Sequence, residues 1–202
     1  MLSTTNAAKL QPLTRLLTAA TEEASTAMYR WTGGQFTLSM EEACELPWEH
    51  VCDHFGLGDE TRTTVVMRLE SPWSGDLILM FDDLNGRQLA ASLLGREVKS
   101  DEPWSDLERS ALTETGNIVG CAYLNAITRL LGTELMPTPP VFVEDFGASV
   151  LGQAVVAHAM QSERVFVCQT WFHRDGATLD ARLFFLPSQE LRQRIMTALS
   201  SR

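Results

Sequence analysis

The spacing of apolar residues divides the first part of the chain into one long helix and one extended segment. Residues 7–32 carry apolar side chains at helical spacing, and Gly33 and Gly34 follow directly. Glycine commonly ends a helix because it adopts a left-handed backbone without a steric penalty. Residues 35–46 then have the pattern of an extended strand. We therefore predict a helix followed by a strand.

A second helix and extended segment follow in the same order later in the chain. Residues 105–131 have helical periodicity and end at Gly132. Residues 134–143 contain three prolines, which favour an extended backbone over a helix. A further helix is predicted over residues 145–161, and it has no counterpart of similar length in the first part.

Two hairpins, each followed by a helix, complete the pattern. Residues 62–94 and 164–199 both indicate a strand, a turn, a strand and a helix. The turns are predicted at Ser74-Gly75 and Asp175-Gly176, because glycine reaches a positive φ angle at little cost. Ser188 is predicted to cap the last helix.

The recurrence of these elements predicts a single α/β (α+β) domain built of two related halves, residues 1–99 and 100–202. The boundary falls in a short acidic turn, residues 100–103. Each half alone would leave its hairpin sheet with an open edge. We therefore expect one continuous, mostly antiparallel sheet flanked by helices.

The composition is typical of a soluble globular protein, because 45% of the 202 residues are hydrophobic and 21% are charged. No apolar run approaches the roughly 20 residues needed to cross a bilayer, and the first residues lack the pattern of a signal peptide. We therefore expect a cytoplasmic protein. A formal net charge of -10 argues against nucleic acid and against an anionic membrane as partners.

The cysteines favour reduced thiols over a disulfide framework, because they are scattered without CxxC spacing. They are Cys44, Cys52, Cys121 and Cys168. One short segment would point His50, Cys52 and His54 the same way if it were extended. No fourth ligand with recognisable spacing follows, so we expect this chain to bind no metal and no cofactor.

The helix predicted over residues 105–131 carries the most informative polar residues. With about 100° between successive residues, Ser110, Glu114 and Asn117 fall within about 60° of one another and share one face. An apolar stripe lies nearly opposite and is expected to anchor the helix on the sheet. Its members are Leu112, Val119, Tyr123, Ala126 and Leu130. Gly116 and Gly120 are expected to allow close helix packing, and the polar face alone is also what an ordinary surface helix shows.

The spacing of these polar residues resembles the signature of the CheC, CheX and FliY chemotaxis phosphatases. In this chain Ser110, three residues, Glu114, two residues, Asn117, 22 residues and Pro140 follow the order of that signature. Residues 117–127, 143–151 and 184–187 are also similar to CheC sequences. The resemblance covers nearly the whole chain in order.

The resemblance implies a CheC-like fold, a function and a site. It implies a phosphatase that hydrolyses the phosphoaspartate of a CheY-like response-regulator receiver and so resets chemotaxis or two-component signalling. Glu114 and Asn117 would be catalytic, and Ser110, Cys121 and Pro140 would contribute to partner contact. Ser110 would be a contact or helix-capping residue rather than a catalyst. Mg²⁺ is then expected on the receiver and not on this chain.

The family's active helix can occur in both halves, and the first half offers Gln11, Arg15 and Thr18 at the motif positions. Arg15 has the wrong charge for Glu and Thr18 lacks a carboxamide, so one active face is predicted. Two other interpretations stay open. One is a non-catalytic CheC-like binding module for a receiver or a CheD-type partner. The other, a FliY-like flagellar-switch component, is less favoured because we expect no additional switch-binding domain.

Overall fold

The fold is built on one six-stranded antiparallel sheet. The computed structural model describes residues 4–70, 72–99, 102–159 and 163–201. In this part of the chain the strand order is β1-β5-β6-β3-β2-β4. The strands are β1 (Phe36–Pro47), β2 (Thr61–Leu69), β3 (Gly75–Phe81), β4 (Val141–Phe146), β5 (Arg164–Arg174) and β6 (Ala177–Pro187). The predicted continuous antiparallel sheet is confirmed.

The strand order interleaves the earlier and later parts of the chain. The hairpins β2-β3 and β5-β6 meet at the centre of the sheet, where β3 pairs with β6. The edge strands are exchanged, because β1 pairs with β5 and β4 pairs with β2. Neither part forms a sheet of its own, and the fold is therefore a single domain. The division into two related halves stays a prediction, and residues 100 and 101 at its boundary lie outside the described residues.

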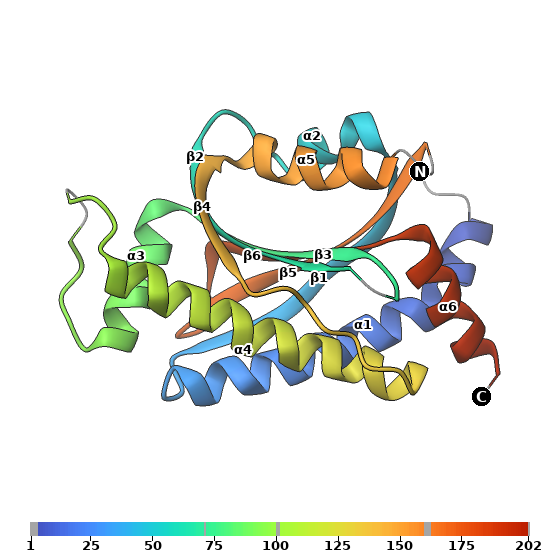
Figure 1. Cartoon of the computed structure of the whole chain (residues 1–202), viewed down its shortest axis with the longest axis horizontal. Coiled ribbons are helices and arrows are strands. Elements are labelled where there is room, and N and C mark those ends of the chain that lie inside the picture. Colours follow the sequence, from blue (N-terminus) through green and yellow to red (C-terminus); the bar gives the residue numbers. More distant parts are fainter. Residues whose placement is uncertain (1–3, 71, 100–101, 160–162, 202) are drawn as a thin grey trace.

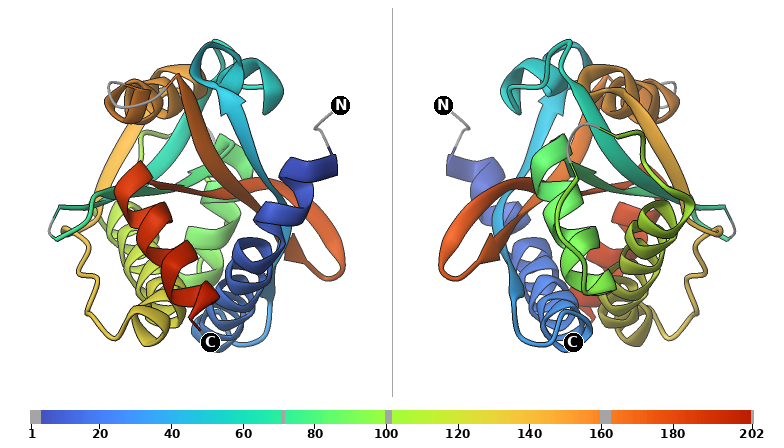
Figure 2. Two further views of the ribbon diagram at one scale, coloured as in Figure 1. Left: turned by 90° about the vertical axis from the view of Figure 1, so that its right-hand side faces the viewer. Right: turned by 90° about the vertical axis from the view of Figure 1, so that its left-hand side faces the viewer.

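Helices cover both faces of the sheet. Figures 1 and 2 show α1, α3, α4 and α6 on one face and α2 and α5 on the other. The helices are α1 (Thr4–Trp31), α2 (Val51–His54), α3 (Asp83–Leu94), α4 (Asp106–Leu131), α5 (Gly147–Ala159) and α6 (Gln189–Ser200), with a short 3-10 helix, η1 (Trp48–His50), before α2. The larger core, which includes Tyr123 and Phe172, lies under the four-helix layer. The smaller core includes Phe55 and Leu151 and lies under α2 and α5.

The ends of α4 and α6 follow the predicted local signals. Ser105 and Glu108 form a capping box at the start of α4, with the Glu108 carboxylate accepting from the Ser105 backbone N–H at 2.8 Å. Gly132 ends α4 with a φ angle of 62°. Ser188 caps α6 by accepting from the backbone N–H of Leu191 at 3.2 Å. These contacts satisfy backbone groups that have no partner inside the helix.

The two hairpin turns differ. Asp175 and Gly176 form the predicted turn, with φ angles of 50° and 80° that fit a two-residue hairpin loop. Gly75 is instead the first residue of β3 and has no positive φ. A Cβ atom on Gly75 would lie 3.1 Å from the carbonyl oxygen of Leu186, so this glycine allows close strand pairing. Ser74 lies in the connection between β2 and β3 as predicted, whereas Gly75 belongs to the strand and not to the turn.

The segment that carries His50, Cys52 and His54 is helical and not extended. It forms η1 and α2. On a helix, Cys52 points away from the side that His50 and His54 share. Its thiol instead donates to the carbonyl oxygen of Ala148 at 3.6 Å. The extended arrangement considered for these three side chains is therefore wrong.

Helix α5 begins at Gly147, two residues later than predicted. Asp145 and Phe146 still belong to β4, where they pair with β2. The predicted end at residue 161 lies outside the described residues. Across the described part of the chain, no helix has the length and apolarity that a membrane span requires.

Candidate functional site

Two glycines bring α4 close to the sheet. A Cβ atom on Gly116 would lie 2.5 Å from Cγ1 of Val65, and one on Gly120 would lie 2.3 Å from Cε of Met67. Both distances are far below van der Waals contact, so a larger residue would displace α4 or the side chains of β2. The close packing predicted for these glycines is confirmed.

Side-chain contacts hold α4 on both flanks. Toward α1, the indole N–H of Trp31 donates to the hydroxyl of Thr115 at 3.0 Å. Toward β4, Arg109 forms an ion pair with Glu144 at 2.8 Å, and its guanidinium lies 4.8 Å from the ring centre of Phe142. These contacts fix the rotation of α4 about its axis. The sequence analysis did not predict them, because each joins residues far apart in the chain.

The polar face of α4 is open to solvent. Ser110 and Glu114 are exposed, and Asn117 is half-buried. Among the described residues, none forms a hydrogen bond or ion pair with the Glu114 carboxylate, and none accepts from the Asn117 carboxamide. Figure 1 shows α5 on the opposite face of the sheet, so this helix does not cover them. Both side chains are accessible to another molecule.

Cys121 lies one turn beyond Asn117 on the same face of α4. Its thiol donates a hydrogen bond to Oδ1 of Asn117 at 3.6 Å. Partial burial raises the pKa of Cys121, and the negative charge of Glu114 raises it further. The thiol is therefore protonated at neutral pH, which argues against a nucleophile. The contact instead orients the carboxamide of Asn117.

The raised pKa of Cys121 predicts slow alkylation. At neutral pH we expect iodoacetamide to label Cys121 more slowly than a free cysteine, because the thiolate is the reactive form. The rate should still be increasing as the pH rises above about 8.5, the usual pKa of a free thiol. Peptide mass spectrometry of the labelled protein measures this rate, with Cys121→Ser as the control. Labelling at pH 7 as fast as free cysteine would contradict the prediction.

Ser110 and Pro140 lie at the edges of the same surface. Ser110 is in the second turn of α4, and the cap is Ser105, so Ser110 has no capping role. Pro140 directly precedes β4, and its Cβ lies 3.9 Å from the position that a Cβ on Gly116 would occupy. Pro140 therefore borders α4 at Gly116, the residue before Asn117 in the chain.

The corresponding positions of the first half lie on α1. Gln11 and Arg15 are exposed, and Thr18 is half-buried. The hydroxyl of Thr18 donates to the backbone carbonyl of Thr14 at 2.9 Å. Arg15 lines an open groove of about 610 Å³ between α1, α4 and α6. These three positions carry no carboxylate next to a carboxamide.

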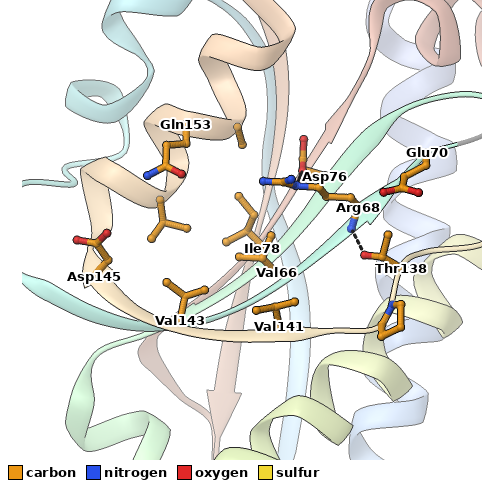
Figure 3. Close-up of a pocket in the computed structure, with 13 residues that line it drawn as sticks. Val66, Arg68, Glu70, Asp76, Ile78, Thr138, Val141, Val143, Asp145 and Gln153 are labelled. Carbon is orange, nitrogen blue, oxygen red and sulfur yellow. Dashed lines mark hydrogen bonds and ion pairs between the residues drawn. The ribbon is translucent and has the colours of Figure 1, made fainter.

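A separate groove of about 600 Å³ lies between β2, β3, β4 and α5 (Figure 3). Val66, Ile78 and Val143 line it. Asp76, which also lines it, is buried and forms a hydrogen bond with His158 at 2.8 Å. The sheet separates this groove from α4, so it takes no part in the polar face. Sequence analysis did not predict the groove, because its walls come from four separate elements.

The polar face of α4 lies in a part of the chain that is similar to a known protein family. A CheC-like family model matches residues 107–144, which include Glu114, Asn117 and Pro140. CheC1 of Halobacterium salinarum is 22% identical over 182 residues, which cover 90% of this chain and 91% of that protein. The CheY-P phosphatase CheC of Bacillus subtilis is 23% identical over 181 residues, which cover 88% of this chain and 87% of that protein.

Solved structures share the fold. FliY of Thermotoga maritima has a TM-score of 0.72 at 14% identity, covering 100% of this chain and 99% of that chain. A chain of the CheX–CheY–BeF3–Mg²⁺ complex of Borrelia burgdorferi has a TM-score of 0.55 at 16% identity, covering 83% of this chain and 94% of that chain. The sequence match over α4, the curated relatives and the shared fold agree. This chain is similar in sequence to CheC proteins over most of its length, and it has the fold of the CheX and FliY structures.

Proposed function

We propose that this protein is a phosphatase that hydrolyses the phosphoaspartate of a CheY-like receiver domain. The polar face of α4 carries the proposal, because Glu114 and Asn117 stand about one turn apart on it, with Glu114 exposed and Asn117 half-buried. The name of the Bacillus subtilis relative, CheY-P phosphatase, supports the reaction. The CheX–CheY complex supports a receiver as the partner.

In this proposal Asn117 enters the receiver's active site and holds a water molecule in line with the phosphorus. A carboxamide both donates and accepts hydrogen bonds, so it can orient a water without acting as a strong base. The water oxygen attacks the phosphorus, and the bond between the phosphorus and the aspartyl oxygen breaks. The products are a free carboxylate and inorganic phosphate. The receiver's own Mg²⁺ and lysine neutralise the charge of the phosphoryl group.

In the same proposal, Glu114 contributes to receiver binding and fixes the position of α4 relative to the receiver's active site. Its carboxylate is exposed and accepts hydrogen bonds from the receiver's active-site lysine. Cys121 lies one turn beyond Asn117 and limits the orientations of the carboxamide, because its thiol donates to one of the two lone pairs of Oδ1. The N–H₂ group of Asn117 then remains free to contact the water.

Replacing Glu114 with alanine is expected to weaken receiver binding roughly 10–100-fold, because a charge-assisted hydrogen bond contributes about 1.5–3 kcal/mol. The measurement is a binding titration with the receiver held in its phosphorylated-like form by BeF3⁻ and Mg²⁺. Glu134→Ala is the matched control, since Glu134 is an exposed carboxylate outside α4. Equal affinities for the wild-type protein and Glu114→Ala would contradict the role of Glu114.

The proposed function itself is tested by the loss of phosphate from a phosphorylated CheY-type receiver in the presence of Mg²⁺. We expect the wild-type protein to accelerate this loss above the receiver's own rate. Binding of receivers from the same genome without any acceleration would favour a non-catalytic binding module instead. A CheD-type partner stays a prediction, and a pull-down with a CheD-type protein would test it.

A further inference from the structure

The edge strand β1 changes the face that its side chains present. Its register with β5 shifts between Met40 and Glu42, which marks a β-bulge. Before the bulge, Leu38 and Met40 contact the core under the four-helix layer. After it, Cys44 belongs to the smaller core under α2 and α5. The bulge thereby turns Glu42 and Cys44, which are two residues apart on one side of the strand, toward α2.

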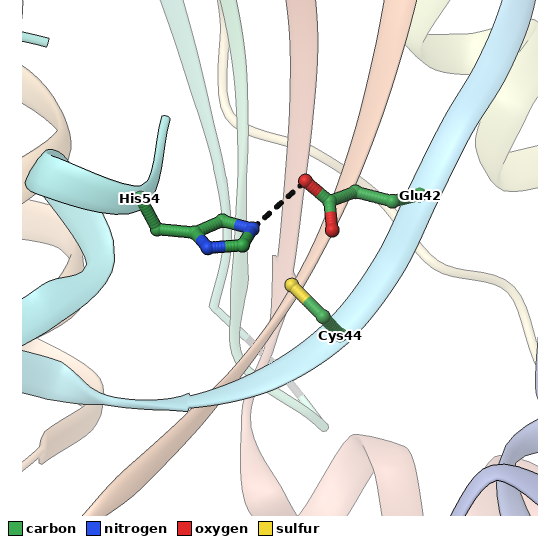
Figure 4. A group of neighbouring side chains, drawn as sticks. All are labelled: Glu42, Cys44 and His54. Atoms are coloured by element: carbon green, nitrogen blue, oxygen red, sulfur yellow. Dashed lines mark hydrogen bonds and ion pairs between the residues drawn. The ribbon is translucent and has the colours of Figure 1, made fainter. Parts of the chain in front are cut away.

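His54, the last residue of α2, meets these two side chains (Figure 4). Its Nε2 atom lies 2.9 Å from Oε1 of Glu42. The potential ligand atoms of Glu42, Cys44 and His54 all lie within 4.8 Å of one another. A side-chain hydrogen bond also joins Cys44 to Glu42. These contacts join three groups that each bind metal ions when they are deprotonated.

The surroundings of the cluster favour a cation. Cys44 is buried, whereas the side chains of His54 and Glu42 are 37% and 36% exposed. The cluster is thus closed on the protein side and open to solvent on the other, which leaves room for a water ligand and an entry path. In the described part of the chain, no arginine or lysine forms an ion pair with Glu42. Burial raises the pKa of Cys44 to about 12, so a bound ion would have to displace the thiol proton. The resulting thiolate and the Glu42 carboxylate would then supply two negative charges.

We propose that Glu42, Cys44 and His54 form a binding site for a divalent transition metal, with Zn²⁺ as the ion that fits best. One sulfur, one nitrogen and one oxygen donor suit Zn²⁺, whereas Mg²⁺ prefers oxygen ligands alone. Metal–ligand bonds of about 2.0–2.3 Å place tetrahedral ligands roughly 3.3–3.8 Å apart. The most widely separated ligand atoms, which lie within 4.8 Å of one another, must therefore approach by up to about 1.5 Å. The exposed imidazole of His54 has the freedom to do so.

A bound ion would join β1 to α2. This position lies on the sheet face opposite α4 (Figures 1 and 2), so the site is separate from the polar face that carries the proposed phosphatase. The ion would stabilise the folded chain by binding it in preference to the unfolded chain. At a free Zn²⁺ concentration of about 100 times Kd, the expected rise in Tm is roughly 5–10 °C.

The test is a titration of the reduced full-length protein with Zn²⁺ in competition with a chromophoric chelator. We expect one Zn²⁺ per chain, and we expect Co²⁺ to give a thiolate charge-transfer absorption band. Cys44→Ser and His54→Ala should each weaken binding by more than the roughly 10–100-fold that loss of an outer-shell partner costs. His54→Ala removes an exposed side chain, so this variant tests the site even where Cys44→Ser folds poorly.

Matched control variants are Cys121→Ser and His50→Ala, which remove a thiol and an imidazole outside the cluster. Both should bind Zn²⁺ as the wild-type protein does, and Mg²⁺ should not compete. The proposal is overturned by an absence of Zn²⁺ binding, by a Co²⁺ complex without thiolate absorption, or by wild-type affinity in His54→Ala.

Discussion

Replacing Asn117 with alanine is expected to reduce the acceleration of receiver dephosphorylation on the order of 10²-fold, because the attacking water loses its positioning. Binding of the BeF3⁻ form of the receiver should change little, since Glu114 and the rest of the α4 surface are intact. Phosphate release from the phosphorylated receiver, measured at saturating protein, separates this loss of rate from a loss of affinity.

Two further substitutions sharpen this test. Asn125→Ala removes another exposed asparagine two turns along α4 and should leave the rate unchanged. Asn117→Asp keeps the size of the side chain but replaces the N–H₂ donor with a charged oxygen, which repels the phosphoryl group. It should therefore be as inactive as Asn117→Ala. Wild-type acceleration in Asn117→Ala would sink the proposed role of Asn117.

Replacing Tyr123 with alanine is expected to lower the free energy of unfolding by about 3–5 kcal/mol. Tyr123 is fully buried between α4 and the sheet, and its ring centre lies 5.4 Å from that of Phe185. Its hydroxyl donates to the Sγ atom of Cys168 at 3.6 Å. The substitution leaves a cavity under the helix that carries Asn117. Urea unfolding followed by circular dichroism measures the effect.

The matched variants separate the ring from its hydroxyl group. Tyr123→Phe keeps the packing and loses one hydrogen bond, so it should cost about 0.5–1.5 kcal/mol. Tyr29→Ala removes the other tyrosine of the chain, which is 53% exposed, and should cost about 0.5 kcal/mol. A cost for Tyr29→Ala equal to that for Tyr123→Ala would show that burial under α4 is not the cause.

Local signals account for the elements that were predicted correctly. The cap at Ser188, the helix end at Gly132 and the turn at Asp175-Gly176 depend on residues within a few positions of one another. Two of the differences from prediction arose where contacts between distant chain segments determine the local structure. Gly75 faces the carbonyl oxygen of Leu186 in a neighbouring strand, and the segment around Cys52 is helical where it packs on α5.

In the candidate site, too, local sequence signals predict some features and contacts between distant segments determine the others. The helical period alone puts Glu114 and Asn117 on one face, and the spacing to Pro140 indicates the family. The contacts that fix α4 come from α1, β2 and β4, and no local pattern reveals them. The resemblance named Cys121 as a partner contact, but its hydrogen bond to Asn117 and its raised pKa depend on the structure.

The sequence by itself determined the order of helices and strands, the anchoring stripe with Tyr123 and the shared face of Glu114 and Asn117. All of these follow from backbone periodicity, which acts over a few residues. Only the tertiary structure decided that β1 and β4 exchange partners, that α5 leaves the polar face uncovered and that a bulge brings Glu42 and Cys44 to His54. The physical reason is that strand pairing and helix docking are chosen by burial between segments distant in the chain, and local spacing does not encode that choice.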